Sequence, residues 1–204
     1  STHNYEEEFC VNAHLEIKKV HNNIITIIIP RHINRIDKIH KKLKKFNIKI
    51  QILNDNDVIN NDTEILLINS FGKLTQYFKY CKSVFIGKSI LKKLISVGGQ
   101  NPIEAAKFGC KIYHGPYVSN FDEVYEFLNN INVAEKIENF KEISLKITND
   151  LNSPKIMNEE NIKKINNYGK EILKKTVSEF SKIILKWNFI NQIFGKKNIT
   201  IFIH

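Results

Sequence analysis

The sequence has little of what marks secreted, metal-binding or membrane-spanning proteins. It contains three cysteines, Cys10, Cys81 and Cys110, which are far apart and lack the spacing of metal ligands. Reduced thiols in a cytoplasmic setting are therefore favoured over a disulfide framework or a zinc site. No uninterrupted apolar run approaches the roughly 18 to 20 residues of a membrane span. Because no cluster of histidine and cysteine suggests a bound metal, we predict chemistry that needs neither a metal nor another cofactor.

Acidic residues are also scarce relative to basic ones, with 21 against 31 and a formal net charge of +10. The lysines occur in pairs along the whole length, such as Lys41-Lys42 and Lys174-Lys175, rather than in one stripe. We therefore predict no specific binding of nucleic acid, although the positive field favours anionic ligands and an anionic membrane surface. The hydrophobic content of 42% is sufficient for a folded core, so we expect a globular protein.

Two of the eight glycines, Gly98 and Gly99, open the most informative stretch, which runs to Glu104. The pair lets the backbone turn tightly and approach a ligand, Asn101 suits the cap of a helix, and Pro102 suits its first position. Free N–H groups at the start of such a helix favour a phosphate. Glu104, one turn in, is placed to accept hydrogen bonds from a sugar diol. The alternative is an ordinary junction between a loop and a helix.

Strand and helix patterns alternate over the first part of the chain. Apolar runs predict strands at 24–29, 49–53, 64–68, 83–86 and 111–114. Amphipathic patterns predict helices at 6–20, 36–46, 74–81 and 104–108. The 24–29 run is β-branched throughout, which is typical of a strand buried on both faces. Short alternating elements build right-handed βαβ units, so we predict an α/β fold with a Rossmann-like parallel sheet and flanking helices.

From residue 121 onward the pattern is helical. The predicted helices cover 121–131, 133–150, 159–174 and 176–194, and a strand signal returns at 199–203. We interpret residues 1–204 as a single domain, of which 133–194 is a helical carboxyl-terminal part.

Polar motifs follow the predicted strands directly or after a short connection. They are Pro30-Arg31-His32, Ser70 to Lys73, Gly98 to Glu104, and Gly115-Pro116. Because ligands of an open parallel sheet lie beyond the carboxyl ends of its strands, we expect these motifs to converge on one edge.

In this order the motifs resemble the 3-deoxy-D-manno-octulosonic acid (Kdo) transferases of lipopolysaccharide synthesis. The matched stretches span residues 1–128 and are Ser1-Thr2-His3 with Glu6-Glu7, Pro30-Arg31-His32 with Arg35, Phe71 to Leu74, Phe85 to Gly87, Gly98 to Glu104, and Gly115-Pro116 with Asn120-Phe121. The family consists of two-domain glycosyltransferases of the GT-B type, which transfer Kdo from CMP-Kdo to a lipid A precursor. The resemblance implies that this chain is the carboxyl-terminal, donor-binding half, a single Rossmann-like nucleotide-sugar-binding domain.

The resemblance also implies which residues bind the CMP moiety. Pro30 and Arg31 are expected against the nucleotide, and arginine suits bidentate recognition of a phosphate or a carboxylate. The backbone of Phe71, Gly72 and Lys73 is expected to frame the base. In the segment Asn101-Pro102-Ile103-Glu104, Asn101 is expected near the phosphate and Glu104 on the ribose. Further candidates are Ser1, Thr2, His3, His32, Gly98 and Gly99.

The chain departs from the family pattern in three places. Lys73 stands where the family usually has glutamate, which favours a backbone role at that position. Gln100 replaces a common histidine. The stretch from Ser89 to Gly98 is longer than usual, so the loop before the glycine pair is expected to differ in shape.

In the family the catalytic base, a glutamate, lies in the amino-terminal half together with the acceptor-binding surface and any membrane anchor. The resemblance implies that this acceptor domain is absent from the given chain. We therefore expect no catalytic residue here and no transfer by the chain alone. The resemblance also implies a place on the cytoplasmic side of the bacterial inner membrane, with CMP-Kdo as donor and, through the other half, a lipid A precursor as acceptor.

Two other interpretations remain at this stage. The first is another GT-B transferase or an epimerase with a UDP-sugar donor, against which Pro30-Arg31-His32 argues. The second is a non-catalytic module that binds a nucleotide or another protein.

Overall fold

The computed structural model describes residues 2–72, 74–152 and 159–194, and side chains in the last range up to residue 187. The sequence expectations for Ser1, Lys73 and the 199–203 strand lie outside the described residues. The chain divides into two compact units, residues 1–162 and 163–204, which we describe separately.

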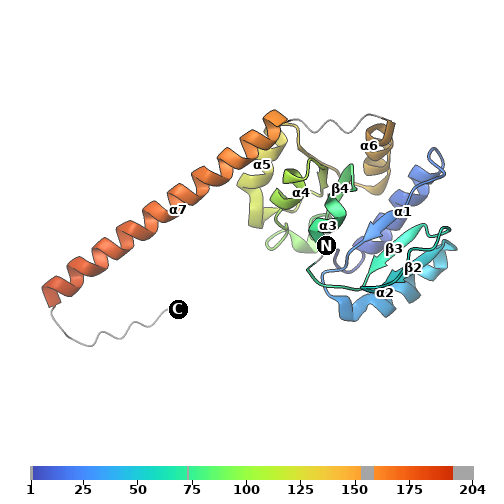
Figure 1. Cartoon of the computed structure of the whole chain (residues 1–204), viewed down its shortest axis with the longest axis horizontal. Helices are drawn as coiled ribbons and strands as arrows, with labels where there is room; N and C mark the ends of the chain where they lie inside the picture. The colour runs from blue at the N-terminus through green and yellow to red at the C-terminus, as the bar shows by residue number, and fades with distance from the viewer. Residues whose placement is uncertain (1, 73, 153–158, 195–204) are drawn as a thin grey trace. The chain divides into compact units, whose positions relative to one another are not determined.

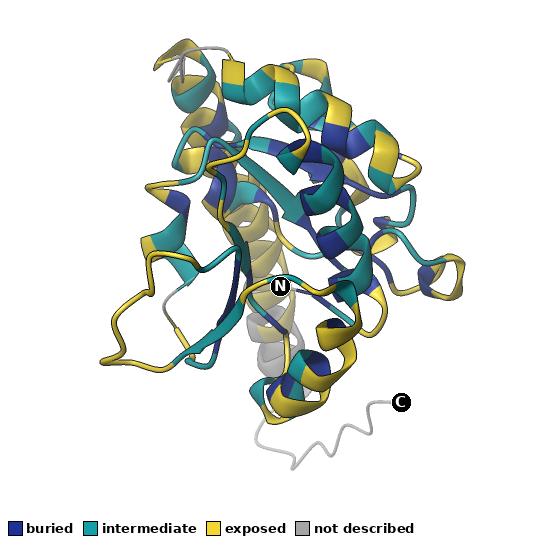
Figure 2. Ribbon diagram, turned by 90° about the vertical axis from the view of Figure 1, so that its right-hand side faces the viewer, coloured by how far each residue is buried: buried dark blue, intermediate teal, exposed yellow. Residues whose placement is uncertain are grey.

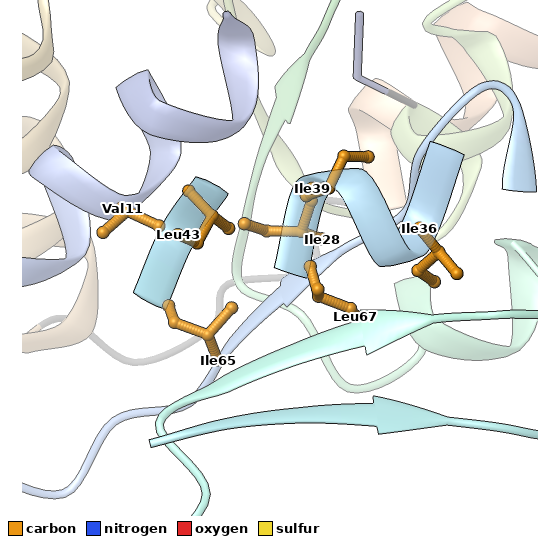
Figure 3. Packing of buried hydrophobic residues seen from close by; sticks show 7 residues of the cluster. All are labelled: Val11, Ile28, Ile36, Ile39, Leu43, Ile65 and Leu67. Carbon is orange, nitrogen blue, oxygen red and sulfur yellow. The ribbon is translucent and has the colours of Figure 1, made fainter. Parts of the chain in front are cut away.

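The first unit contains a parallel sheet of three strands, β1 (Thr26–Ile28), β2 (Ile50–Leu53) and β3 (Ile65–Ile68), in the order β1-β3-β2 (Figure 1). All four residues of β3 are buried, as its continuous apolar run requires of a central strand. Helix α2 (Ile36–Leu43) covers one face of this sheet. Its apolar side packs with Ile28 and Leu67 in one cluster (Figure 3).

A second parallel sheet in the same unit has the order β4-β5-β6, from β4 (Ser83–Ile86), β5 (Lys111–His114) and β6 (Ala134–Lys136). The helices of this part of the chain are α3 (Leu74–Phe78), α4 (Ile103–Lys107), α5 (Asp122–Asn130) and α6 (Phe140–Asn152). Figure 2 shows buried residues gathered on the strands and on the helix sides that face them. Parallel sheets with flanking helices confirm the predicted α/β, Rossmann-like class, although the strands form two groups of three.

Helix α1 (Glu6–Lys18) packs against both sheets. Val11 packs into the core of the first sheet, whereas Ala13 packs into the core of the second. Phe9 lies against Phe85 of β4, with ring centroids 5.0 Å apart. A helix buried on more than one side has no single apolar stripe, which explains the mixed pattern of the 6–20 segment.

The prediction of a helix over 133–150, and of an all-helical part over 133–194, is wrong at its start. Ala134, Glu135 and Lys136 form β6, which pairs in parallel with Ile112–His114, and α6 begins only at Phe140. Strand β6 is an edge strand of its sheet, so one of its edges and its charged side chains can face solvent. Three residues with two charges carry no strand pattern, so only pairing with β5 decides their conformation.

Two further expectations need correction. Residues 159–174 and 176–194 form one helix, α7 (Glu159–Phe194), since nothing at Lys175 interrupts the backbone. The 24–29 run is not buried on both faces: Ile28 is buried, but Ile25 is 45% exposed and Ile27 is half-buried. One edge of β1 borders a groove described below.

The second unit consists, among its described residues, of α7 from residue 163 onward. Many of its apolar side chains are exposed, including those of Ile172, Phe180 and Trp187. Within the described ranges, no helix of either unit is both long enough and apolar enough to span a membrane.

His14 of α1 provides a test of this packing by pH. Its side chain is 1% exposed, its Nδ1 lies 2.9 Å from Thr26 Oγ1, and burial lowers the pKa of His14 to about 4. Since the unfolded chain takes up this proton first, stability should be complete above pH 6.5 and should fall as the pH drops from 6.5 towards 4. By pH 4 the expected loss is about 3 kcal/mol, because the pKa shift from 6.5 to about 4 corresponds to roughly 1.4 kcal/mol per pKa unit.

The measurement is urea unfolding at pH 7, 6, 5 and 4 for the natural chain and for His14→Gln. The variant lacks the titrating ring, so the difference in unfolding free energy between the two chains should shrink as the pH falls. A difference that stays constant across this range would contradict the assigned pKa.

Candidate functional site

The carboxyl end of β1 is extended by a pairing with the amino-terminal segment. Thr2 and Pro30 form a parallel bridge, in which Thr2 N–H donates to Ile29 O (2.9 Å) and Arg31 N–H donates to Thr2 O (3.0 Å). Thr2 and Pro30 are both buried, and the Thr2 hydroxyl donates to Glu7 Oε1 (3.1 Å). The backbone is therefore held up to Arg31, whose side chain is exposed just beyond the strand end.

The two arginines of this region differ in their surroundings. Arg35 Nη2 lies 3.1 Å from Glu7 Oε1, with side-chain exposures of only 19% and 6%. A partly desolvated ion pair of this kind has a structural role, because removing either partner leaves the other charge uncompensated and destabilises the fold. Of the two arginines, Arg31 is the one whose side chain is exposed at this edge. Arg31 is also the arginine that the sequence predicts to contact the nucleotide.

Glu6 joins the amino-terminal segment to the loop after β4. Its side chain is fully buried, and its carboxylate accepts hydrogen bonds from the backbone N–H groups of His3 (2.9 Å), Lys88 (2.8 Å) and Ser89 (3.1 Å). Lys88 has a left-handed backbone with φ +60°, an uncommon conformation for a residue other than glycine. The carboxylate thus stabilises a loop that is separated from it by about 80 residues of chain.

The glycine pair lies directly beside this loop. Gly99 N–H donates to Lys88 O at 2.7 Å, and both glycines are buried. A Cβ atom on Gly98 would lie 2.2 Å from the carbonyl oxygen of Tyr117. The backbone that Gly98 approaches is therefore that of the chain itself, where the sequence analysis expected a ligand.

The segment after the glycines has the predicted capping chemistry. Helix α4 begins at Ile103, whose N–H donates to Asn101 Oδ1 at 3.0 Å, and Pro102 before it has a helical backbone. Pro102 is buried and Ile103 is half-buried, whereas Asn101 and Glu104 are exposed. The two polar side chains proposed for phosphate and ribose are thus accessible on the same turn.

The two histidines from the candidate list meet at this edge. The rings of His3 and His32 are 6.3 Å apart in an edge-on arrangement. Burial lowers the pKa of His3 despite the opposing charge of Glu6, and the charges of Lys88 and His32 lower it further. Phe71 and Gly72 are exposed at the carboxyl end of β3, the parallel neighbour of β1.

Sequence reasoning missed Ser89, which organises the loops of this edge. Ser89 is fully buried, and its hydroxyl donates to Ile86 O (2.7 Å) and accepts from Gly115 N–H (2.9 Å). Its carbonyl oxygen accepts from Tyr117 N–H at 2.9 Å. The only signal in the sequence was a small polar residue two positions after the glycine that ends a strand, which is too common to assign.

An apolar groove of about 510 Å³ lies at the same side of the molecule as Thr2, Asn101 and Glu104. It is bordered by β1 and β4, and Thr2, Asn101 and Glu104 lie on its lining. Within the described part of the chain, no group of three or more histidine, cysteine, aspartate and glutamate side chains is arranged to hold a metal ion. The prediction of metal-independent chemistry is not tested by that observation.

Comparison with known proteins gives relatives in sequence and in fold. No protein-family model matches the chain. It is 27% identical over 148 residues to the 3-deoxy-D-manno-octulosonic acid transferase of Aquifex aeolicus, which is 72% of this chain and 39% of that protein. It is 28% identical over 186 residues to the transferase of Rickettsia prowazekii, which is 90% of this chain and 38% of that protein. The chain is similar in sequence to these Kdo transferases.

The fold of the chain also matches that of a solved domain. It is similar to the solved C-terminal CMP-Kdo binding domain of WaaA from Acinetobacter baumannii, with a TM-score of 0.70 and 21% identity over 82% of this chain and 84% of that domain. The chain spans less than two fifths of the length of the Kdo transferases of Aquifex aeolicus and Rickettsia prowazekii. The resemblance to the carboxyl-terminal half is thereby confirmed, and the roles of single residues remain predictions.

Proposed function

We propose that this chain binds CMP-Kdo as the donor-binding half of a Kdo transferase, a glycosyltransferase of the GT-B type. The observation that carries the proposal is the likeness in fold to a CMP-Kdo binding domain over most of both chains. The exposed side chains of Arg31, Asn101 and Glu104 at the carboxyl ends of parallel strands and on the first turn of α4 support it. Ligands of parallel α/β sheets bind at such an edge.

Each group suits one part of a CMP ligand. The Arg31 guanidinium offers paired donors to the phosphate or to the Kdo carboxylate. The exposed Glu104 carboxylate accepts hydrogen bonds from the two ribose hydroxyls. Asn101, whose Oδ1 already accepts from Ile103 N–H, presents its amide beside the phosphate. Thr2 lies on the lining of the same groove as Asn101 and Glu104. We assign His3 and His32, whose rings lie 6.3 Å apart, to the surroundings of the phosphate, and the backbone of Phe71 and Gly72 to the base.

In this proposal, the donor-binding half binds CMP, the leaving group of the reaction. An acceptor hydroxyl attacks the anomeric carbon of Kdo, the bond to the phosphate oxygen breaks, and CMP departs with additional negative charge. Arg31 stabilises that charge electrostatically without a metal. The base that takes the hydroxyl proton and the surface that binds a lipid A precursor belong, in this proposal, to the amino-terminal half of a longer protein. The chain alone then binds the donor without transferring Kdo.

A place at the cytoplasmic side of the bacterial inner membrane completes the proposal. The acceptor of such a transferase is a lipid, so the donor half works close to a membrane surface. A net charge of +10 favours approach to anionic headgroups.

The test is calorimetric titration of the chain with CMP, UMP and AMP. We expect CMP to bind at least about tenfold more tightly than the other two, a difference of roughly 1.4 kcal/mol. Preference for UMP would instead indicate a UDP-sugar donor. Binding of none of the three would favour an interaction module without a nucleotide site.

Arg31→Ala should weaken CMP binding by roughly 1.5 to 3 kcal/mol, the usual contribution of a charge-assisted contact. Arg35→Ala is the matched control, because Arg35 is paired with Glu7 at 3.1 Å and its loss should lower stability rather than affinity. Titration of both variants with CMP, together with their urea unfolding curves, separates the two effects. An equal loss of affinity at both positions would mean that the end of β1 is misassigned.

Glu104→Ala should weaken CMP binding by about 2 kcal/mol, or roughly thirtyfold, because alanine accepts no hydrogen bond from the ribose. The decisive ligand is 2′-deoxy-CMP. The natural chain should discriminate against the deoxy ligand, and Glu104→Ala should hardly distinguish the two ligands. If both chains show the same ribose preference, Glu104 acts only on the helix dipole, a contribution of about 0.3 to 1 kcal/mol.

A further inference from the structure

A second cavity, of about 240 Å³, lies between the amino end of α1 and one side of α2. None of the residues assigned above to CMP is part of its lining. Ile39 and Leu43 of α2, which belong to the core cluster of the first sheet (Figure 3), form its apolar side. Since one water occupies roughly 30 Å³ in the liquid, the cavity has room for a phosphate group and part of the molecule that carries it.

The charges around this cavity favour an anion. Arg35 and Glu7 lie on its lining and pair with each other at 3.1 Å. Lys38 lies on the lining as well, is exposed, and forms no ion pair with any residue of the described ranges. Lys42, the third cation of the lining, pairs with Glu8. An ammonium group has three N–H donors, so this pairing leaves Lys42 with donors for a ligand.

Tyr5 brings a further lysine to the cavity. Its ring is 60% exposed, and the Nζ atoms of Lys42 and Lys93 lie 4.3 Å and 5.1 Å from the ring centroid. Cation–π attraction stabilises both ammonium groups at the ring. Lys93 is exposed and forms no ion pair within the part of the chain that the structure describes. Two like charges at one ring repel each other, and a bound anion would compensate both.

The backbone of Tyr5 indicates that the ring has a use. Tyr5 is left-handed, with φ 78° and ψ −16°, a conformation that glycine adopts without strain and a tyrosine does not. It precedes α1 but makes no side-chain hydrogen bond that caps the helix. A tyrosine at this position therefore stabilises neither the turn nor the start of the helix. Strained residues of this kind are concentrated at functional sites.

We propose that this cavity binds a phosphate monoester, with Lys38, Lys42 and Lys93 as its cationic groups. Tyr5 is the positioning residue, since it places two of these lysines. A phosphate dianion accepts several charge-assisted hydrogen bonds at once, and lysines provide such donors on flexible stems. The site goes beyond the donor function, because it uses none of the residues assigned to CMP. A phosphorylated sugar and a lipid headgroup that ends in a phosphate monoester share this chemistry.

The test is an NMR titration of the isotope-labelled chain with inorganic phosphate at constant ionic strength, without and with CMP. The amide signals of Tyr5, Lys38 and Lys93 should shift saturably in both series. The double variant Lys38→Gln, Lys93→Gln loses two charge-assisted contacts, so its phosphate affinity should fall by about tenfold or more. All of these side chains are exposed, and the fold should therefore be unaffected.

The double variant Lys41→Gln, Lys92→Gln is the matched control. It removes the same two charges from the neighbouring positions, which do not line the cavity and are also exposed. Screening by salt limits the effect of such charges, so the control should change phosphate affinity by less than about twofold. Equal losses in the two double variants would overturn the proposal, since net charge alone would then attract phosphate. Displacement of phosphate by CMP would also overturn it.

Tyr5→Gly separates binding from folding. Glycine relieves the left-handed backbone, so the Tm of this variant should rise. Its phosphate affinity should nevertheless fall by about threefold or more, because Lys42 and Lys93 lose the ring that places them. A higher Tm with unchanged phosphate affinity would overturn the role assigned to Tyr5.

Two further ligands identify what carries the phosphate. Tighter binding of glucose phosphate than of inorganic phosphate would support a phosphorylated sugar. Binding to phosphatidylcholine vesicles that contain phosphatidic acid, lost in the Lys38→Gln, Lys93→Gln variant, would support a lipid headgroup. Phosphate binding is measured here without CMP as well as with it. A chain that binds phosphate and not CMP would therefore support this site while contradicting the donor function.

Discussion

Glu6→Gln is expected to lower the free energy of unfolding by about 3 kcal/mol. The carboxylate is fully buried and accepts from three backbone N–H groups, at 2.8 to 3.1 Å. Glutamine keeps one acceptor oxygen and turns an NH2 group towards the remaining donors, so at least one buried N–H loses its partner. Each loss of a hydrogen bond to a charged group costs roughly 1.5 to 3 kcal/mol, and an unsatisfied buried donor adds to it.

Glu8→Gln is the matched control, since it makes the same change in the same helical turn. Glu8 is only partly buried and pairs with Lys42 and Lys45, whose side chains are 40% and 56% exposed. Exposed pairs of this kind contribute about 0 to 1 kcal/mol. Urea unfolding followed by circular dichroism measures both variants. Similar losses would show that Glu6 acts through the helix dipole alone and not through the loop after β4.

Gly115→Ala is expected to destabilise the first unit by about 3 kcal/mol or more. A Cβ atom there would lie 2.2 Å from Ser89 O and 2.5 Å from Ile90 Cα, and both are backbone atoms. Relief would require the chain at Ser89 to move, which breaks the bond from Gly115 N–H to Ser89 Oγ (2.9 Å). Overpacking of this kind costs about 1 to 3 kcal/mol even where side chains can adjust.

Gly169→Ala provides the control for the glycine substitution. A Cβ atom at this position of α7 meets nothing within 4 Å. Alanine is favoured over glycine in a helix by about 1 kcal/mol, so this variant should keep or slightly raise helical content. Thermal unfolding followed by circular dichroism compares the two variants. Tolerance of alanine at Gly115 would mean that the loops around Ser89 are not packed as described.

Local chemistry could be predicted from sequence where it depends on neighbouring residues. The cap of α4 is such a case, since Asn101 and Pro102 are adjacent to the helix that they begin. The preference for Arg31 over Arg35 followed from the position of a strand end and agrees with the pairing of Arg35 to Glu7. Motif order was sufficient to recognise the relationship to the Kdo transferases. The cap and the choice of arginine each lie within a few residues of the sequence signal that predicts them.

Other features depended on contacts that no local pattern contains. Strand β6 has two charged residues among three and forms because Ile112 to His114 offers it a parallel edge. The close approach of the Tyr117 carbonyl to Gly98 leaves no room there for a Cβ atom, and no local pattern shows that contact.

The sequence by itself determined the apolar strands, the helix cap and the polar motifs, because side-chain volume, backbone preference and hydrogen-bonding groups act over a few positions. Tertiary structure alone decided that Glu6 holds the loop at Lys88, because that bond joins residues 82 positions apart. It also decided that β1 borders a groove, since an edge exists only once strands have paired. Long-range pairing sets the surroundings of a side chain, and the surroundings set its role.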